Sequence, residues 1–235
     1  MSFLQDQSDL IPIAIGVAAI VTLLGVILGF AFRRGPSKST ILLLGINDAG
    51  KTALFTTLCY GQKSNTATSM KENEGTWTVD KKSFEIVDIP GHERVRIRYT
   101  DFLPVTRAIV FVVDSTTVAR QVRAVAEYLY NVLAQKRVQS ERIPILIACN
   151  KADMITALPK EKIKLRLEAE IQQLRSTRTA AVEQQEAMDD EQGEAFLGFE
   201  GEDFTFEQLD NEVSFESCSV EKADLGAIED YILSN

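Results

Sequence analysis

The segment Gly45–Thr52 constrains the fold of this chain more than any other feature of the sequence. It has the pattern G-x-x-x-x-G-K-T and follows the apolar run Ile41–Leu44 directly. Glycines let such a loop curl so that its N–H groups face phosphate oxygens, and the positive end of the following helix faces the same anion. The pattern predicts a phosphate-binding loop, although a glycine-containing turn can resemble one. The candidate ligands are Gly45, Asn47, Asp48, Ala49, Gly50, Lys51 (for the outer phosphates) and Thr52 (for Mg²⁺).

Short apolar runs alternate with amphipathic segments from Thr40 onward. This alternation is typical of an α/β fold, here a P-loop domain with a mostly parallel six-stranded sheet flanked by helices. The predicted strands are Thr40–Leu44, Trp77–Val79, Phe84–Asp88, Ala108–Asp114, Ile143–Cys149 and Val213–Cys218. A polar turn between the second and third of these predicts a hairpin. The predicted helices are Lys51–Cys59, Val118–Gln135, Lys160–Arg178 and Leu225–Leu233.

An uncharged apolar stretch, Leu10–Phe32, precedes this domain. Because about 20 helical residues span the hydrocarbon layer of a membrane, the stretch predicts a transmembrane helix. A cleaved signal peptide and a buried core helix are the alternatives. The acidic start and the length argue against the first, and the lack of polar positions at helical spacing argues against the second. Arginines follow the stretch, so the tail 1–9 is expected outside the cytosol and the linker 33–39 and the domain 40–235 within it.

The net charge of −9 is unevenly distributed along the chain. Residues Glu183–Glu212 contain twelve Asp and Glu and no Lys or Arg, while the rest of the chain carries about +3. The acidic segment 179–203 is therefore predicted to be a disordered surface loop. No broad basic face remains, so direct nucleic-acid binding is not expected. The three cysteines lie far apart in apolar or small-residue contexts, which is typical of core residues in a reducing compartment.

Two segments at the ends of predicted strands indicate which nucleotide the loop binds. Asp88 can hold a water on Mg²⁺, and the nearby Gly91 can offer its N–H to a γ-phosphate. The second segment is Asn150-Lys151-Ala152-Asp153. The Asp153 carboxylate can accept hydrogen bonds from guanine N1–H and the 2-amino group, which adenine lacks, while Asn150 braces the loop and the Lys151 stem covers the base. The expected ligands are therefore GTP or GDP with Mg²⁺.

Phosphate loop, Asp-x-x-Gly and Asn-Lys-x-Asp follow one another here in the order found in the small GTPases of the Ras and Arf type, which this chain resembles. The resemblance implies that the loop Cys218-Ser219-Val220 meets the guanine oxygen. Val220 and Glu221 stand where alanine and lysine are usual. The resemblance also implies a threonine between the phosphate loop and the Asp-x-x-Gly segment that caps Mg²⁺, with Thr68 the first choice and Thr66 the second.

Within that superfamily the chain resembles the beta subunits of the signal recognition particle receptor. The resemblance covers nearly the whole chain and rests on the N-terminal span with Asp88–Glu93, Arg107–Ser115 and Leu146–Asp153. It implies a single-pass protein of the endoplasmic reticulum membrane that holds the receptor's alpha subunit in a GTP-dependent way. Contacts with the ribosome and the translocon would be indirect. Ser2 stands where myristoylation of Arf-type relatives needs glycine, so the span replaces a lipid anchor.

Two residues leave the extent of catalysis open. His92 stands where Ras-like enzymes place the glutamine that orients the attacking water, and Asn47 replaces a glycine of Ras-type loops. His92 is the candidate catalytic residue, and the hypothesis is slow intrinsic hydrolysis with the GTP form serving as a binding surface. The alternative functions are an Arf-like trafficking GTPase that recruits coat or tethering factors and an anchor that keeps GTP permanently.

Overall fold

The computed structural model describes Thr22 and residues 38–62, 71–184 and 196–235, with the backbone alone at 179–184. Two compact units divide the chain, Met1–Ser37 and Lys38–Asn235. The predicted transmembrane helix 10–32 lies outside the described residues apart from Thr22, as do the tail 1–9 and residues 33–37 of the linker. Within the described part of the chain, no helix is both long and apolar enough to cross a membrane.

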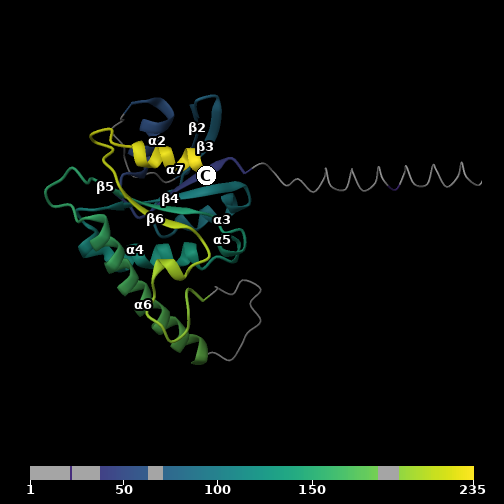
Figure 1. Cartoon of the computed structure of the whole chain (residues 1–235), viewed down its shortest axis with the longest axis vertical. Coiled ribbons are helices and arrows are strands. Elements are labelled where there is room, and N and C mark those ends of the chain that lie inside the picture. Colours follow the sequence, from purple (N-terminus) through teal and green to yellow (C-terminus); the bar gives the residue numbers. More distant parts are fainter. Residues whose placement is uncertain (1–21, 23–37, 63–70, 185–195) are drawn as a thin grey trace, which may run out of the picture. The chain divides into compact units, whose positions relative to one another are not determined.

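Six strands form one sheet in the order β2-β3-β1-β4-β5-β6 (Figure 1). β2 runs antiparallel to β3, and all other neighbours are parallel. The predicted α/β class, the mostly parallel six-stranded sheet and the hairpin are therefore confirmed. The strands are β1 (Thr40–Leu44), β2 (Asn73–Val79), β3 (Lys82–Asp88), β4 (Thr106–Asp114), β5 (Ile145–Asn150) and β6 (Val213–Ser217).

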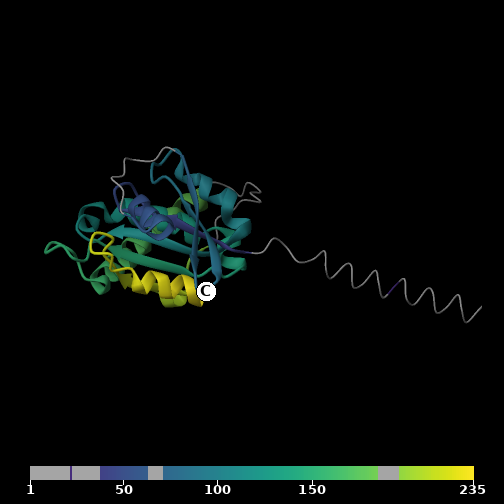
Figure 2. The same cartoon turned by 90° about the horizontal axis from the view of Figure 1, so that it is seen from above.

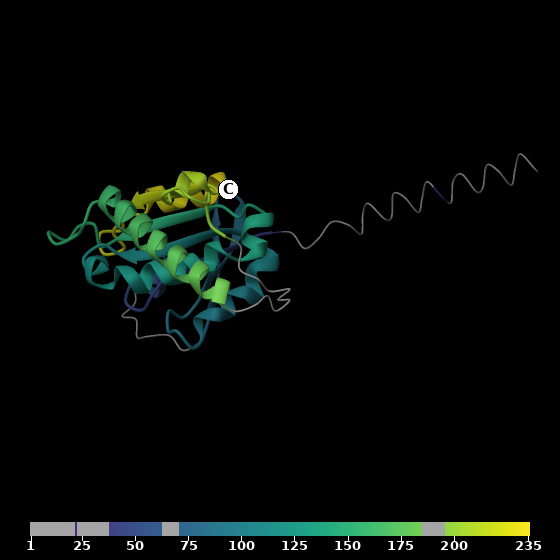
Figure 3. The same cartoon turned by 90° about the horizontal axis from the view of Figure 1, so that it is seen from below.

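Helices cover both faces of the sheet, with α2 and α7 on one face (Figure 2) and α4 and α6 on the other (Figure 3). Ile41 and Leu43 pack in the first layer and Leu42 and Leu44 in the second, all fully buried. A strand buried on both faces needs an uninterrupted apolar run, because successive side chains point to opposite faces. The helices are α2 (Lys51–Tyr60), α3 (Tyr99–Phe102), α4 (Val118–Leu133), α5 (Lys136–Ser140), α6 (Lys160–Gln184) and α7 (Gly226–Ser234).

Short or exposed elements account for most differences from the predicted elements. β2 begins at Asn73, four residues before the predicted start at Trp77. The prediction missed this first half because β2 is an edge strand whose first residues are polar or glycine and exposed or half-buried, so they form no apolar run. The short helices α3 and α5 and the three 3₁₀ turns were not predicted, since single helical turns are too short to show helical periodicity. The 3₁₀ turns are η1 (Arg96–Arg98), η2 (Leu103–Val105) and η3 (Phe206–Gln208).

The acidic segment 179–203 differs from the prediction at both of its ends. α6 continues to Gln184, and residues 196–203 pack against the domain, where Leu197 is fully buried. The prediction of a disordered loop is wrong for residues 196–203, because Leu197 and the apolar residues that follow this segment reach the core despite the surrounding acids. The stretch 185–195 of the predicted loop lies outside the described residues.

Candidate functional site

The phosphate loop joins the carboxyl end of β1 to the first turn of α2, as the sequence predicts. Gly45 and Gly50 have φ angles of 136° and 98°, which favour glycine. A Cβ on Gly45 would lie 2.3 Å from the carbonyl oxygen of Val112, and one on Gly50 would lie 2.3 Å from Nδ2 of Asn150. The loop therefore lies against the ends of β4 and β5 at distances that no larger residue allows.

Lys51 is the buried cation of this loop, with 6% of its surface exposed. Its Nζ donates a hydrogen bond to the carbonyl oxygen of Ile46 at 2.9 Å, so the ammonium turns back into the loop. Burial lowers the pKa of Lys51, and the carboxylates of Asp88 and Asp48 oppose this shift in part. A buried charge is costly unless it is paired, so this position favours an anionic ligand.

Asp88, at the end of β3, is fully buried beside the loop. Its Oδ2 accepts hydrogen bonds from Thr52 Oγ1 at 2.7 Å and from Asn73 Nδ2 at 3.0 Å. Its Oδ1 is buried and accepts no hydrogen bond from any residue that the structure describes. Burial raises the pKa of this carboxyl, against the hydrogen bonds from Thr52 and Asn73 and the charge of Lys51. An acceptor left open in this way suits a water held on Mg²⁺.

Protein side chains alone would not enclose a metal ion here. In the described ranges, no group of three or more His, Cys, Asp or Glu could hold one. Mg²⁺ commonly takes one or two protein ligands and completes its shell with phosphate oxygens and water, so Thr52 and Asp88 fit such a site. Thr68 and Thr66, the candidates for capping the ion, lie outside the described residues.

Gly91 packs directly against the phosphate loop. A Cβ at this position would lie 2.6 Å from the backbone nitrogen of Asn47 and 2.7 Å from the carbonyl oxygen of Gly45. The Asp-x-x-Gly segment and the phosphate loop are thus brought together. His92 is half-buried, and its Nδ1 accepts a hydrogen bond from the backbone N–H of Arg94 at 3.3 Å. The catalytic role of His92 stays a prediction.

Asn150 joins the phosphate loop to the two loops predicted to meet the base. Its Nδ2 donates to the carbonyl oxygen of Ala49 at 2.9 Å, and its Oδ1 accepts the N–H of Val220 at 3.1 Å. Ser219 Oγ donates to Asp153 Oδ1 at 2.6 Å. The segments Asn150–Asp153 and Cys218–Val220 therefore lie together, and the contact of Cys218–Val220 with the guanine oxygen stays a prediction.

A cavity of about 250 Å³ opens between these loops. Its lining combines apolar surface with the carboxylates of Asp153 and Glu221, which suits a flat heterocycle that carries hydrogen-bond donors. The lining residues are Gly50, Ala53, Asn150, Lys151, Asp153, Met154, Val220 and Glu221.

Lys151 is held at this cavity by two partners. Its φ angle is 63°, and its Nζ donates to the carbonyl oxygen of Asp48 at 3.0 Å and pairs with Asp114 Oδ2 at 2.6 Å. Burial alone would raise the pKa of Asp114, but hydrogen bonds from Lys151 and Thr116 outweigh it and hold the pKa below its usual range. Asp114 therefore positions the lysine stem beside the cavity.

Asn73 and Asp114 contribute to the site, although no local sequence pattern assigns them to it. Asn73 lies opposite Asp88 in the register of the β2–β3 hairpin, which becomes visible only when β2 is extended beyond its apolar part. Asp114 ends β4, and in a parallel sheet the carboxyl ends of neighbouring strands meet at one edge. That rule is the signal that could have placed Asp114 next to the Asn-Lys-x-Asp segment.

Fold and site together define a P-loop protein with the fold of the Ras- and Arf-like GTPases. The family model described as "Signal recognition particle receptor beta subunit" matches residues 36–213. The chain belongs to this family.

Relatives and solved structures agree with this assignment. The signal recognition particle receptor subunit beta of Rattus norvegicus is 36% identical over 231 residues, which cover 96% of this chain and 85% of that protein. "The Structure of the Mammalian SRP Receptor" contains a chain that is 36% identical, with a TM-score of 0.71, covering 83% of this chain and 98% of that one. The SRb-GDP-Mg structure from Chaetomium thermophilum is 29% identical, with a TM-score of 0.63, covering 86% of this chain and 97% of that one.

Proposed function

We propose that this chain binds GTP and GDP, with Mg²⁺, at the carboxyl ends of its parallel strands. The observation that carries the proposal is the bridging by Asn150, whose side chain bonds both the phosphate loop and the loop of Val220 beside the cavity of about 250 Å³. The SRb-GDP-Mg structure from Chaetomium thermophilum, of a related protein, supports it. The proposed ligand-binding residues are Gly45, Asn47, Asp48, Ala49, Gly50, Lys51, Thr52, Thr68, Gly91, Asn150, Lys151, Asp153, Cys218, Ser219 and Val220.

The residues that line the site fit this ligand. Ser219 holds one oxygen of Asp153, so the carboxylate can accept hydrogen bonds from guanine without rotating. The buried Lys51 ammonium neutralises phosphate charge, and the glycine backbone approaches closely because no Cβ intervenes. A bound Mg²⁺ would supply further positive charge to the phosphates. Thr52 would hold it directly and Asp88 through a water.

We further propose that the segment after Gly91 changes with the nucleotide. Its N–H can contact a γ-phosphate, which GDP lacks, and the segment continues into η1 and α3. Arg98 pairs with Glu72 at 2.8 Å, so the segment is also tied to the residues just before β2. Together these form a surface whose shape depends on the third phosphate. His92 is the proposed water-positioning residue, with slow hydrolysis.

The proposed cellular role is that of the GTP-binding beta subunit of the signal recognition particle receptor. The span 10–32 would anchor the chain in the endoplasmic reticulum membrane, with residues 1–9 in the lumen and the domain 40–235 in the cytosol. The GTP-dependent surface would hold the receptor's alpha subunit there for co-translational targeting, so contacts with ribosome and translocon would be indirect. Membership of the family supports this role.

Capture of the purified alpha subunit by the full chain in nanodiscs tests the role. We expect at least about tenfold more alpha subunit to be retained when the chain carries GTP than when it carries GDP. Equal retention with both nucleotides contradicts GTP dependence, and preferred capture of coat proteins supports the Arf-like alternative.

Chromatography of the nucleotide that copurifies with the protein tests the third alternative, an anchor that keeps GTP permanently. A single-turnover rate of about 1 s⁻¹ for hydrolysis of bound GTP without a partner would contradict slow hydrolysis.

A further inference from the structure

Two phenylalanines are exposed near the end of the acidic segment 179–203. Phe196 is 40% exposed and Phe199 is 57% exposed, whereas Leu197 between them is fully buried. Beside them lies a cavity of about 190 Å³, bounded by this segment, by Gln139 of α5 and by Leu209–Asn211. We call the surface formed by Phe196, Phe199 and this cavity the phenylalanine face.

Arg175 of α6 holds the phenylalanine face in place. It is 4% exposed, and it donates a hydrogen bond to the carbonyl oxygen of Phe199 at 2.5 Å. Its Cζ lies 4.5 Å from the centre of the Phe196 ring, within the range of a cation–π contact. Gly198 has a φ angle of 74°, and a Cβ there would lie 2.4 Å from Gln208 Oε1. The backbone is thus held by the core, and exposure of the two rings is a property of the folded domain.

The surroundings of the phenylalanine face are acidic. Residues 196–212 contain six Asp and Glu and no Lys or Arg. Of these acids Glu207 pairs with Lys164, while Glu200, Glu202, Asp203 and Asp210 are all exposed. On α5, which borders the cavity through Gln139, Arg137 pairs with Glu141 at 2.9 Å. Two exposed rings are therefore set in a strip of negative charge.

We propose that the phenylalanine face is a docking site for a basic segment of a partner protein that carries an apolar anchor side chain. The anchor would enter the cavity beside the rings, and lysines or arginines around it would meet the exposed carboxylates. The same charge argues against two other occupants. Residues 185–195 of this chain carry five acids and no base, and an anionic lipid surface is negative as well.

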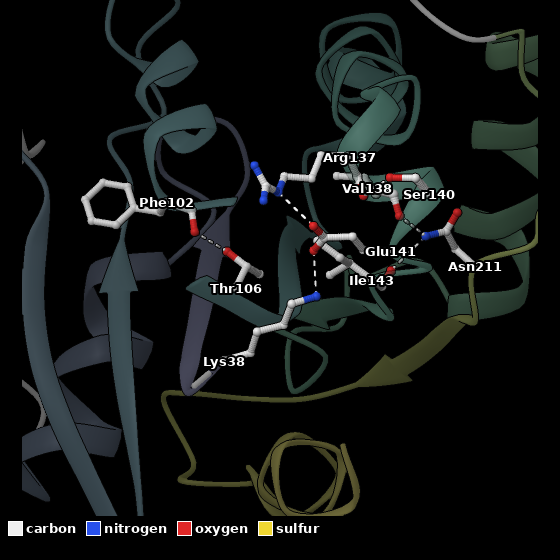
Figure 4. Close-up of polar contacts among 9 residues, drawn as sticks. All are labelled: Lys38, Phe102, Thr106, Arg137, Val138, Ser140, Glu141, Ile143 and Asn211. Carbon is white, nitrogen blue, oxygen red and sulfur yellow. Dashed lines mark hydrogen bonds and ion pairs between the residues drawn. The ribbon is translucent and has the colours of Figure 1, made fainter. Parts of the chain in front are cut away.

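The phenylalanine face lies at the opposite end of the sheet from the candidate nucleotide site. Asn211, which borders the cavity, donates hydrogen bonds to the carbonyl oxygens of Val138 at 2.8 Å and Ile143 at 3.0 Å, just before β5 begins (Figure 4). The nucleotide-site residues follow the other, carboxyl ends of the strands. A partner can therefore occupy the phenylalanine face while nucleotide is bound, and changes at this face are expected to leave nucleotide affinity unchanged.

Site-specific photo-crosslinking in the full chain at its membrane tests the proposal. p-Benzoylphenylalanine replaces Phe199, and as a matched control it replaces Leu165, which is 66% exposed on α6. We expect cross-links from position 199 to a protein segment rich in Lys and Arg, at least about tenfold above those from position 165. Raising the salt to about 0.5 M before illumination is expected to weaken them.

Two variants carrying the probe at position 199 separate the two parts of the proposal. The triple variant Glu200→Gln, Glu202→Gln, Asp203→Asn keeps the rings and removes charge, and Phe196→Ala keeps the charge and removes one ring. Each is expected to reduce the cross-link about tenfold, while Leu165→Ala leaves it unchanged. Unchanged thermal unfolding shows that each variant still folds.

Four outcomes of the first experiment would overturn the proposal. These are cross-links to lipid, cross-links to residues 185–195 of the same chain, cross-links to a neutral or acidic partner segment, and a yield no higher than that of the control. A cross-link that survives both variants also contradicts it. Because the assay does not depend on which nucleotide is bound, its failure is distinguishable from failure of the proposed GTP-dependent role.

Discussion

The two ends of the sheet differ in which side chains are buried: polar side chains are buried at the carboxyl ends of the strands, and apolar rings are exposed at the amino end. At the carboxyl ends, Asp88, Asp114 and Asn150 are buried, and their hydrogen bonds hold the surrounding loops in one arrangement. At the amino end, Phe196 and Phe199 are exposed and acidic side chains surround them.

Each arrangement suits a different kind of ligand. Buried polar groups are costly unless they are hydrogen-bonded. Asp88 Oδ1 accepts no hydrogen bond from the described residues, so this network points to a small ligand that completes it. Rigid exposed rings lose no hydrogen bonds when covered, so they suit a macromolecular surface. We therefore predict that a substitution can abolish ligand binding at one end and leave binding at the other end unchanged.

The largest expected effect comes from Asp153→Asn at the carboxyl end. The amide would present a donor to the donors of guanine, so GTP affinity is expected to fall by about 10³-fold or more, while xanthosine triphosphate, with an oxygen at position 2, gains affinity. Titration with fluorescent nucleotides measures both. Asp210→Asn, beside the phenylalanine face, is the matched control and should change neither affinity. Unchanged GTP binding by Asp153→Asn would show that the cavity does not hold the base.

Arg175→Met tests the amino end of the sheet, where Arg175 holds the phenylalanine face. The carbonyl oxygen of Phe199 loses its buried donor, so the free energy of unfolding is expected to fall by about 3 kcal/mol, with faster hydrogen exchange in residues 196–204. Chemical denaturation and exchange mass spectrometry measure these changes. Arg166→Met, on the exposed side of the same helix, should cost no more than about 0.5 kcal/mol. A loss of GTP affinity in Arg175→Met would show that the two ends are coupled.

Asp114→Asn tests the ion pair between Asp114 and Lys151 of the Asn150–Asp153 loop. The pKa of Asp114 is lowered in the folded protein, so the carboxylate stabilises the fold above its unfolded pKa of about 3.9 and loses this contribution as the pH falls through the folded pKa. The substitution is expected to cost about 2 kcal/mol at pH 7 and less below about pH 4. Denaturation at the two pH values measures the difference. A cost that is the same at both pH values contradicts the ion pair, and the exposed Asp101→Asn serves as control.

Lys38→Ala has the smallest expected effect. Lys38 pairs with Glu141 at 2.5 Å at the start of the domain, and their side chains are 40% and 25% exposed (Figure 4). Solvent and salt screen such pairs, so the substitution is expected to lower the free energy of unfolding by about 0.5 kcal/mol or less. At high salt the substitution is expected to have no effect on the free energy of unfolding. Comparison with the exposed Lys162→Ala isolates the pair. A cost above about 1.5 kcal/mol would mean that the amino end is held together by charge and not by packing.

The sequence predicted the central strands and the long helices well. β1 and β4 are buried on both faces and read as unbroken apolar runs, and α4 and α6 are long enough to show helical spacing. The edge strand β2 and the single-turn helices carry no such pattern, so their bounds were wrong or missing. The predicted loop 179–203 was partly wrong, because composition describes the average of a segment, whereas the buried Leu197 and the contacts of Arg175 hold its end.

What the sequence determined by itself was the set of loops whose chemistry depends on their own backbone. Gly45–Thr52 and Asn150–Asp153 are recognisable because glycine, lysine and aspartate are needed at fixed local spacings to meet a phosphate or a base. Only the tertiary structure decided that Asn73 reaches Asp88, that Asp114 holds Lys151, and that Arg175 holds Phe199 at the surface. Those partners lie far apart along the chain or in strands without a clear pattern, so strand register and helix packing, and not local sequence, bring them into contact.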